Sequence, residues 1–185
     1  MDSTLFLRQN GEHFDGTIGG WLKVVAIIQA RMGSTRLPGK VLMDLAGATV
    51  LARVVHRLRR AKLITEVLVA TTDHPADDAI VAECRKCSVA VSRGDQENVL
   101  NRYYRAAQVS KTDIIVRITS DCPLIDPGIT DKTIAAFLEE KPDYASNVMK
   151  RTYPRGLDTE VMSFHDTINA RACLAIHSAG GIEQR

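Results

Sequence analysis

Short apolar runs alternate with amphipathic segments along most of this chain. Apolar residues recur at helical spacing in four segments, which predicts helices at about 48–61, 75–86, 95–107 and 127–140. Four short, apolar-rich runs predict strands between them, at 24–29, 66–71, 88–92 and 113–119. Strands that alternate with helices predict an α/β domain with a mainly parallel sheet.

The ends of these elements are less clearly marked than their interiors. Asp95 and Asp126 are each expected to be the N-cap of the helix that follows. Beyond residue 140 the pattern weakens, and we expect strands within 144–148 and 157–164 and a helix after Asp166.

The domain is expected to cover residues 23–185, because the first 22 residues are polar and rich in glycine and predict a poorly ordered extension. Composition is that of a soluble globular protein, with 24 basic and 22 acidic residues, so net charge gives no reason to expect a nucleic-acid partner. No apolar run reaches the roughly 18 residues of a membrane span. The N-terminus lacks the pattern of a signal peptide.

Cysteines and histidines add little to the functional picture. Cys84 and Cys87 have a C-x-x-C spacing, but no second pair accompanies them, so reduced thiols in the cytoplasm are expected instead of a metal site. The five histidines show no ligand spacing. We therefore expect a cytoplasmic protein without a cysteine–histidine metal centre.

Polar segments follow four of the predicted strands. In parallel sheets, ligands bind beyond the carboxyl ends of the strands. These ends are therefore expected to meet at one crevice, to which they bring basic residues, hydroxyls and acids. The four segments are QARMGSTR, ATTDH, SRGD and ITSDCP.

The loop after the first strand resembles a P-loop at first sight, because it contains GSTRLPGK. A P-loop needs four residues between its glycines and a Ser or Thr after the lysine. Here five residues separate Gly33 from Gly39, and Val41 follows Lys40. The spacing therefore argues against P-loop geometry.

The same loop still carries the residue types that bind polyphosphates. Gly33 and Gly39 permit close backbone approach, and Arg31, Arg36 and Lys40 provide positive charge. A loop that wraps a triphosphate is the functional interpretation. A basic surface turn is the structural alternative.

Three acids are candidate metal ligands. Asp121 comes just after a buried strand, where a carboxylate can hold Mg²⁺ against phosphate oxygens or can cap a turn. Asp158 and Glu160 alternate along a predicted strand, so both are expected on one face, either beside that metal or in solvent.

Weaker candidates follow the second strand. Thr71 and Thr72 are expected to contact a base or ribose, and Asp73 either joins them or opens a turn.

Five ordered motifs resemble the sugar cytidylyltransferases, the superfamily of the acylneuraminate and 3-deoxy-manno-octulosonate cytidylyltransferases, and are most similar to its SpsF-like spore-coat polysaccharide branch. The resemblance covers residues 24–171. Its motifs are IIQARMGSTRLPGKVL, ATTD, RGDQENVLNRYYRAA, RITSDCPLIDP and YPRGLDTEV.

The resemblance implies a Rossmann-like, three-layer nucleotide-diphospho-sugar transferase fold. It implies an enzyme that joins CTP to a sugar, often an acidic or 2-keto-3-deoxy sugar, and releases pyrophosphate with Mg²⁺ as cofactor, for surface polysaccharide synthesis. The loop from Ala30 to Lys40, including Ser34, would hold the nucleotide, and Arg31, Arg36 and Lys40 would neutralise charge on the phosphates. Asp121 would bind Mg²⁺, and the second ligand maps best onto Asp158, with Glu160 as the alternate.

The chain also departs from the family pattern. An arginine-glutamate-histidine segment and final helices, which commonly form a dimer contact, would follow GGIEQR in SpsF-like chains. We therefore expect a C-terminally shortened chain and consider an inactive CTP-binding remnant, or a partner subunit, as an alternative. A nucleotide-sugar-dependent glycosyltransferase is a further alternative, because D-T-E at 158–160 loosely resembles D-x-D.

Overall fold

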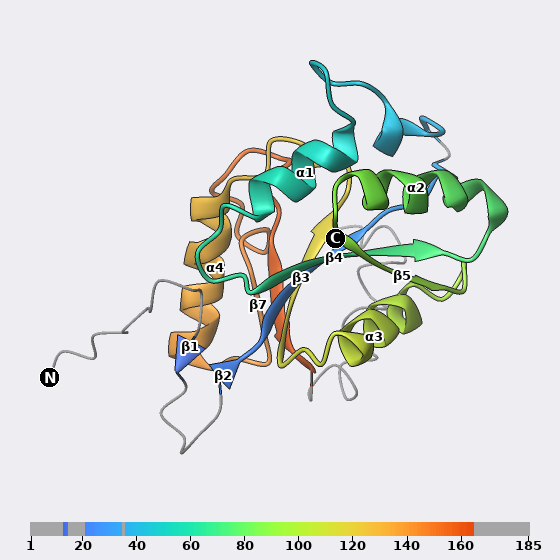
Figure 1. Ribbon diagram of the computed structural model, residues 1–185. Helices are drawn as coiled ribbons and strands as arrows, with labels where there is room; N and C mark the ends of the chain where they lie inside the picture. The colour runs from blue at the N-terminus through green and yellow to red at the C-terminus, as the bar shows by residue number, and fades with distance from the viewer. Residues whose placement is uncertain (1–12, 15–20, 35, 165–185) are drawn as a thin grey trace, which may run out of the picture.

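A six-stranded mixed sheet forms the centre of the molecule (Figure 1) in the computed structural model, which describes residues 13–14, 21–34 and 36–164. Its strand order is β5-β4-β3-β6-β8-β7. The first four of these are parallel, whereas β8 runs antiparallel to β6 and to β7. The strands are β3 (Val24–Gln29), β4 (Glu66–Thr72), β5 (Ala90–Gly94), β6 (Ile114–Thr119), β7 (Tyr144–Ser146) and β8 (Glu160–Ser163).

Helices cover both faces of this sheet. Figure 1 shows α1 (Val50–Leu58) and α2 (Asp78–Lys86) over one face and α3 (Val99–Val109) over the other. The helix α4 (Pro127–Glu140) packs into the same core as α1. The predicted three-layer α/β architecture is confirmed. The remaining elements are β1 (His13–Phe14), β2 (Trp21–Leu22), and the short 3₁₀ helices η1 (Lys40–Leu42) and η2 (Pro75–Asp77).

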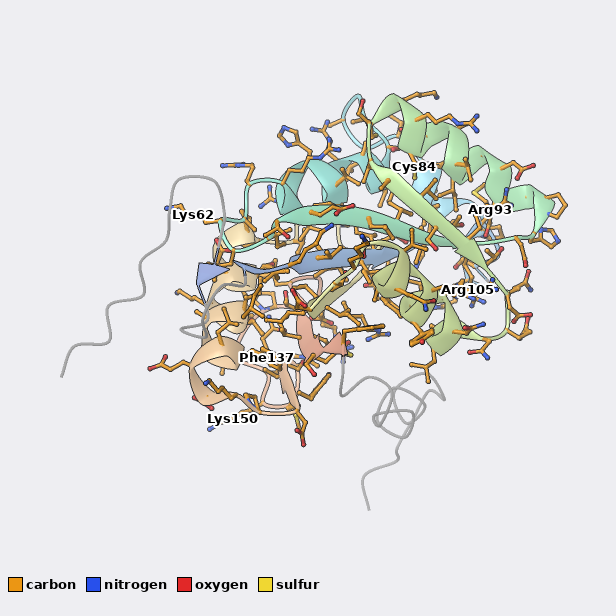
Figure 2. The ribbon with its side chains drawn as sticks, turned by 60° about the horizontal axis from the view of Figure 1, so that its bottom comes forward. Lys62, Cys84, Arg93, Arg105, Phe137 and Lys150 are labelled. Carbon is orange, nitrogen blue, oxygen red and sulfur yellow. The ribbon has the colours of Figure 1, made fainter. Side chains whose placement is uncertain are left out.

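The central strand β3 contributes to two cores. Val24, Ala26 and Ile28 pack with α1, α2 and α4, whereas Val25 and Ile27 pack with α3. Cys84 on α2 and Phe137 on α4, both labelled in Figure 2, belong to the first core. Because both faces of β3 are covered by helices, nearly all of its residues are apolar.

Of the two predicted helix N-caps, the structure confirms one and contradicts the other. The Asp126 side chain accepts a hydrogen bond from the Ile129 N–H at 3.0 Å and caps α4, as predicted. The prediction for Asp95 was wrong, because Asn98 caps α3. The Asp95 carboxylate instead accepts the N–H groups of Glu97 and Asn98 in the preceding turn.

Several element boundaries also shifted. The strand predicted at 88–92 begins at Ala90, the helix predicted from 48 begins at Val50, and the strand predicted at 157–164 begins only at Glu160. The expected N-terminal extension falls almost entirely outside the described residues, and the helix expected after Asp166 falls wholly outside them. Among the described residues, no helix has the length and apolar character of a membrane span.

Strand order places a switch point beside β3. The chain builds β4 and β5 on one side of β3 and then returns to build β6 on the other side. In open α/β sheets, the loops that leave two such strands at their carboxyl ends diverge and form the ligand crevice. The ligand crevice is therefore expected between the segments that follow β3 and β6.

Candidate active site at the switch point

The loop that leaves β3 closes on the carbonyl of Met32. This oxygen accepts hydrogen bonds from the N–H groups of Ser34 at 2.9 Å and Gly39 at 3.0 Å. Gly39 has φ of +70°, in the left-handed region, where a side chain would be strained. The glycine therefore permits the turn that ends the loop and begins η1.

Val41 explains why this loop is not a P-loop. Its side chain is 1% exposed and packs in the core with residues of α1. A P-loop places a hydroxyl at this position for the metal. Here the residue after the lysine anchors the loop to the core instead, and Lys40 projects from that anchored turn.

Lys40 meets Asp121 across the switch point. The Lys40 Nζ lies 2.6 Å from the Asp121 Oδ2, and both side chains keep contact with solvent. Partial burial acts to raise the pKa of Asp121, but hydrogen bonds from Lys40 and Thr119 outweigh it and hold that pKa below its ordinary value. The loops after β3 and β6 are thus joined by an ion pair between ionised groups.

Two more cations lie on the same loop. Arg31 and Arg36 are exposed, and neither forms an ion pair or hydrogen bond with another described side chain. The Ser34 Oγ accepts a 3.4 Å hydrogen bond from Leu37, and Gly33 is open to solvent. Ala30 is buried and continues the ladder by donating to the Ala70 carbonyl. Within the described part of the chain, the loop therefore presents more positive charge than its contacts balance.

The two late acids, Asp158 and Glu160, have different surroundings. Glu160 is buried, pairs with Arg117 on the neighbouring strand and accepts the Tyr144 hydroxyl at 2.9 Å. Asp158 lies outside the strand, is partly exposed and pairs with Arg151 at 2.9 Å. The two acids were expected to alternate along one strand, but only Glu160 lies in β8, and Asp158 is the more accessible of the two candidate ligands.

Strand register also distinguishes these two acids. Because β8 begins at Glu160, which pairs with Arg117 in antiparallel register, Asp158 lies toward the carboxyl end of β6. Burial raises the pKa of the Cys122 thiol, and the charges of Asp121 and Asp158 raise it further. Both carboxylates are therefore near the same cysteine.

The two carboxylates fit a hard cation. Asp121 and Asp158 offer oxygen ligands, which Mg²⁺ prefers, and magnesium sites of this kind use one or two carboxylates plus substrate phosphates and water. Among the described residues, no group of three or more His, Cys, Asp and Glu side chains forms a complete metal cage. This arrangement suits a metal that arrives with a phosphate ligand.

Thr71 and Thr72 lie at the end of β4. Both are buried, and both hydroxyls donate to the Oδ2 of Asp77. Asp73 is exposed, and its N–H donates to the Gly94 carbonyl at 3.0 Å.

Asp77 was not singled out from the sequence as a site residue. It is 2% exposed and also accepts the Met32 N–H at 2.8 Å. Its only sequence signal was an acid in the first turn of a helix, which many helices have.

The four predicted segments do meet at one edge. Lys40 joins the β3 loop to Asp121 after β6, and Asp77 joins it to the end of β4. At the end of β5, the Gly94 carbonyl accepts the N–H of Asp73 from the segment after β4. The predicted clustering of strand ends is confirmed.

Comparisons with known proteins agree with this geometry. A family model described as cytidylyltransferase matches residues 25–172. The chain is 40% identical over 125 residues to the spore coat polysaccharide biosynthesis protein SpsF of Bacillus subtilis, with 65% of this chain and 52% of that protein covered. It is 38% identical over 117 residues to a 3-deoxy-manno-octulosonate cytidylyltransferase of Trichlorobacter lovleyi, with 63% and 46% covered.

Solved structures give the same picture. A cytidylyltransferase from Leptospira borgpetersenii is 39% identical with a TM-score of 0.76, and the match covers 80% of this chain and 63% of that one. CMP:2-keto-3-deoxy-manno-octonic acid synthetase in complex with CTP, at 18% identity and a TM-score of 0.63, shares the fold.

The family model matches most of the chain, and the strand order, the loop after β3 and the Lys40–Asp121 pair are consistent with it. The chain spans about half the length of the curated relatives it matches. It belongs to the cytidylyltransferase family.

Proposed function

We propose that this chain carries the nucleotide-binding core of an enzyme that transfers the cytidylyl group of CTP to a sugar and releases pyrophosphate. The observation that carries the proposal is the Lys40–Asp121 pair at the switch point, on the same loop as Arg31 and Arg36, which have no partner among the described side chains. A site with surplus positive charge next to a metal-competent carboxylate suits a polyphosphate with a divalent cation.

The reaction needs little covalent chemistry from the protein. A sugar hydroxyl oxygen attacks the α-phosphorus, its proton passes to solvent, and the bond to the β-phosphate oxygen breaks with its electron pair on pyrophosphate. Catalysis then consists of positioning and of stabilising the charge that builds on the leaving group. Lys40 would supply this stabilisation, and Arg31 and Arg36 would add to it from the same loop.

The chain would hold Mg²⁺ through Asp121 and Asp158. The metal supplies charge neutralisation and orientation of the phosphate oxygens when it is bound. Each carboxylate is paired with a cation in this structure, Asp121 with Lys40 and Asp158 with Arg151. On binding of the metal nucleotide, Lys40 would exchange its carboxylate partner for the phosphates.

The proposed acceptor is an acidic sugar of the 2-keto-3-deoxy class, and the proposed setting is surface polysaccharide synthesis in the cytoplasm. Support comes from relatives named 3-deoxy-manno-octulosonate cytidylyltransferase and spore coat polysaccharide biosynthesis protein. Family membership weighs against the glycosyltransferase alternative, which would use a nucleotide sugar and release a nucleoside diphosphate.

The deciding experiment is a pyrophosphate-release screen. Each of the four nucleoside triphosphates is tested with 2-keto-3-deoxy acids and neutral sugars, with and without Mg²⁺. Release that needs CTP, an acidic sugar and Mg²⁺ together is the expected result. CTP binding without release for any sugar would instead support a binding remnant or partner subunit, and release of a nucleoside diphosphate from a nucleotide sugar would support a glycosyltransferase.

A further inference from the structure

We propose that Asp77 is a positioning residue that sets the location of the nucleotide loop and, through it, of Lys40. The inference rests on the proposed function in that the loop from Ala30 to Lys40 holds the nucleotide. It goes beyond that function because Asp77 lies on another segment of the chain, between β4 and α2, and is not itself a ligand of nucleotide or metal.

Met32 is the residue through which Asp77 acts on the loop. Its N–H donates to the Asp77 Oδ1 at 2.8 Å, and its carbonyl accepts the N–H of Gly39 at 3.0 Å. Lys40 follows Gly39 directly and begins η1. A continuous path of hydrogen bonds and backbone therefore runs from the Asp77 carboxylate to the start of the lysine side chain.

Asp77 itself is held firmly. Its second oxygen, Oδ2, accepts the Thr71 hydroxyl at 3.1 Å, the Thr72 N–H at 3.1 Å and the Thr72 hydroxyl. Burial acts to raise the pKa of Asp77, but hydrogen bonds from Thr72, Met32 and Thr71 outweigh it and keep the pKa below its ordinary value. The carboxylate is therefore a fixed anion with one oxygen on the strand end and the other on the loop.

Charge around Asp77 links it to the neighbouring loops. Burial lowers the pKa of Arg102, and the charge of Arg31 lowers it further, whereas Asp77 acts in the opposite direction. Arg102 is 2% exposed, and its Nε and Nη2 have no hydrogen-bond partner among the described residues. The negative charges of Asp77 and Asp95 thus favour the charged form of this buried cation of α3, which the Arg31 charge of the nucleotide loop opposes.

An amide at position 77 would break this arrangement. Asn has one acceptor oxygen and one NH₂ group, so it cannot accept both the Met32 N–H and the Thr72 N–H, neither of which can reverse its direction. One backbone N–H would be left without its carboxylate partner. A lost hydrogen bond to a charged group of this kind corresponds to about ten- to hundredfold in an equilibrium constant.

Asp131 offers a matched control at the opposite end of the sheet. Its two carboxylate oxygens accept the N–H groups of Lys62 and Leu63, each at 2.9 Å, and so tether the turn before β4. Asp131→Asn removes the same kind of tether at a distance from the switch point. Both variants are expected to lose stability, and only Asp77→Asn should disturb the nucleotide loop.

The first test is amide hydrogen exchange on the ligand-free chain, resolved by residue. In the unsubstituted protein, the Met32 and Gly39 amides should exchange at least tenfold more slowly than the exposed Gly33 amide, which has no acceptor among the described residues. Asp77→Asn should remove this protection, whereas Asp131→Asn should retain it. An unprotected Met32 amide in the unsubstituted protein would overturn the proposal even if Asp77→Asn failed to fold.

The second test is the affinity for CTP with Mg²⁺, measured by calorimetry at a temperature where all three proteins are fully folded. Asp77→Asn should weaken binding at least tenfold, and Asp131→Asn should leave it within twofold. Equal affinities in the two variants would overturn the positioning role. If the unsubstituted chain bound no CTP, the proposed function would fail, whereas the exchange experiment would still decide whether Asp77 fixes the loop.

Discussion

The two edges of the parallel sheet carry nearly the same ion pair in different surroundings. At the amino edge, Lys23 Nζ lies 2.6 Å from a Glu66 oxygen, and at the carboxyl edge, Lys40 Nζ lies 2.6 Å from an Asp121 oxygen. The lysines are 38% and 27% exposed, so neither length nor burial clearly distinguishes the pairs.

What differs is the charge and backbone around each pair. At Lys23, the ammonium group pairs with Glu66, and the backbone N–H donates to the Asp113 carboxylate at 2.7 Å. Near Lys40, Arg31 and Arg36 lack partners among the described side chains, and the backbone turns through a left-handed glycine. The comparison teaches that a surface ion pair marks a site only where uncompensated charge and diverging strand ends accompany it.

The largest expected difference between the two edges is the effect of replacing each lysine on the rate of pyrophosphate release. Lys40→Ala should lower the rate of CTP-dependent pyrophosphate release by about 10²–10³-fold, the usual effect of losing one group that stabilises transition-state charge. Lys23→Ala should change the rate less than about twofold, since its pair lies at the opposite edge. Steady-state rates of the two variants, each checked for folding by circular dichroism, make the comparison, and equal loss in both would contradict it.

The two late acids provide the next sharpest test. Asp158→Asn should weaken binding of Mn²⁺, used as a probe for Mg²⁺, by about tenfold or more in the presence of CTP. Glu160→Gln should leave that affinity nearly unchanged in the folded fraction, because Glu160 is committed to Arg117 and Tyr144. Electron paramagnetic resonance titration of free Mn²⁺ gives both values, and the reverse order would assign the ligand to Glu160.

Replacement of either lysine should have a similarly small effect on the free energy of unfolding. Both pairs are partly exposed, and such pairs contribute about 0–1 kcal/mol to the free energy of unfolding. Urea unfolding of Lys40→Ala and Lys23→Ala should therefore give values within about 1 kcal/mol of the unsubstituted chain. A larger loss for Lys40→Ala would mean that its rate effect is partly a folding effect.

The smallest expected effect is on acid stability. The pKa of Asp121 is lowered in the folded state, so its contribution is present above the unfolded value of about 3.9 and is lost as pH falls through the folded pKa. Asp121→Asn should therefore lose less unfolding free energy than the unsubstituted chain between about pH 5 and pH 2. Urea unfolding across this pH range measures the difference, and parallel curves would show that Lys40 does not stabilise the carboxylate.

Prediction from the sequence succeeded where one local rule decided the outcome. The apolar run of β3 required burial on both faces, and Asp126 before Pro127 and Gly128 formed the expected helix start. It failed where two local rules competed, as in the segment from Asp95 to Asn98. Either residue could be the N-cap of α3. In the structure Asn98 is the N-cap, and Arg102 of the same helix packs against Gly94.

The sequence by itself determined the fold class and the chemical character of the loop between Ala30 and Lys40, because periodicity and residue type suffice for both. Only the tertiary structure decided which carboxylates Lys40 and Arg151 meet and which of the two late acids is buried against Arg117. It also revealed Asp77. The physical reason is that a hydrogen bond between Asp77 and Met32 spans 45 residues, and such a contact depends on strand order and register, which no local pattern records.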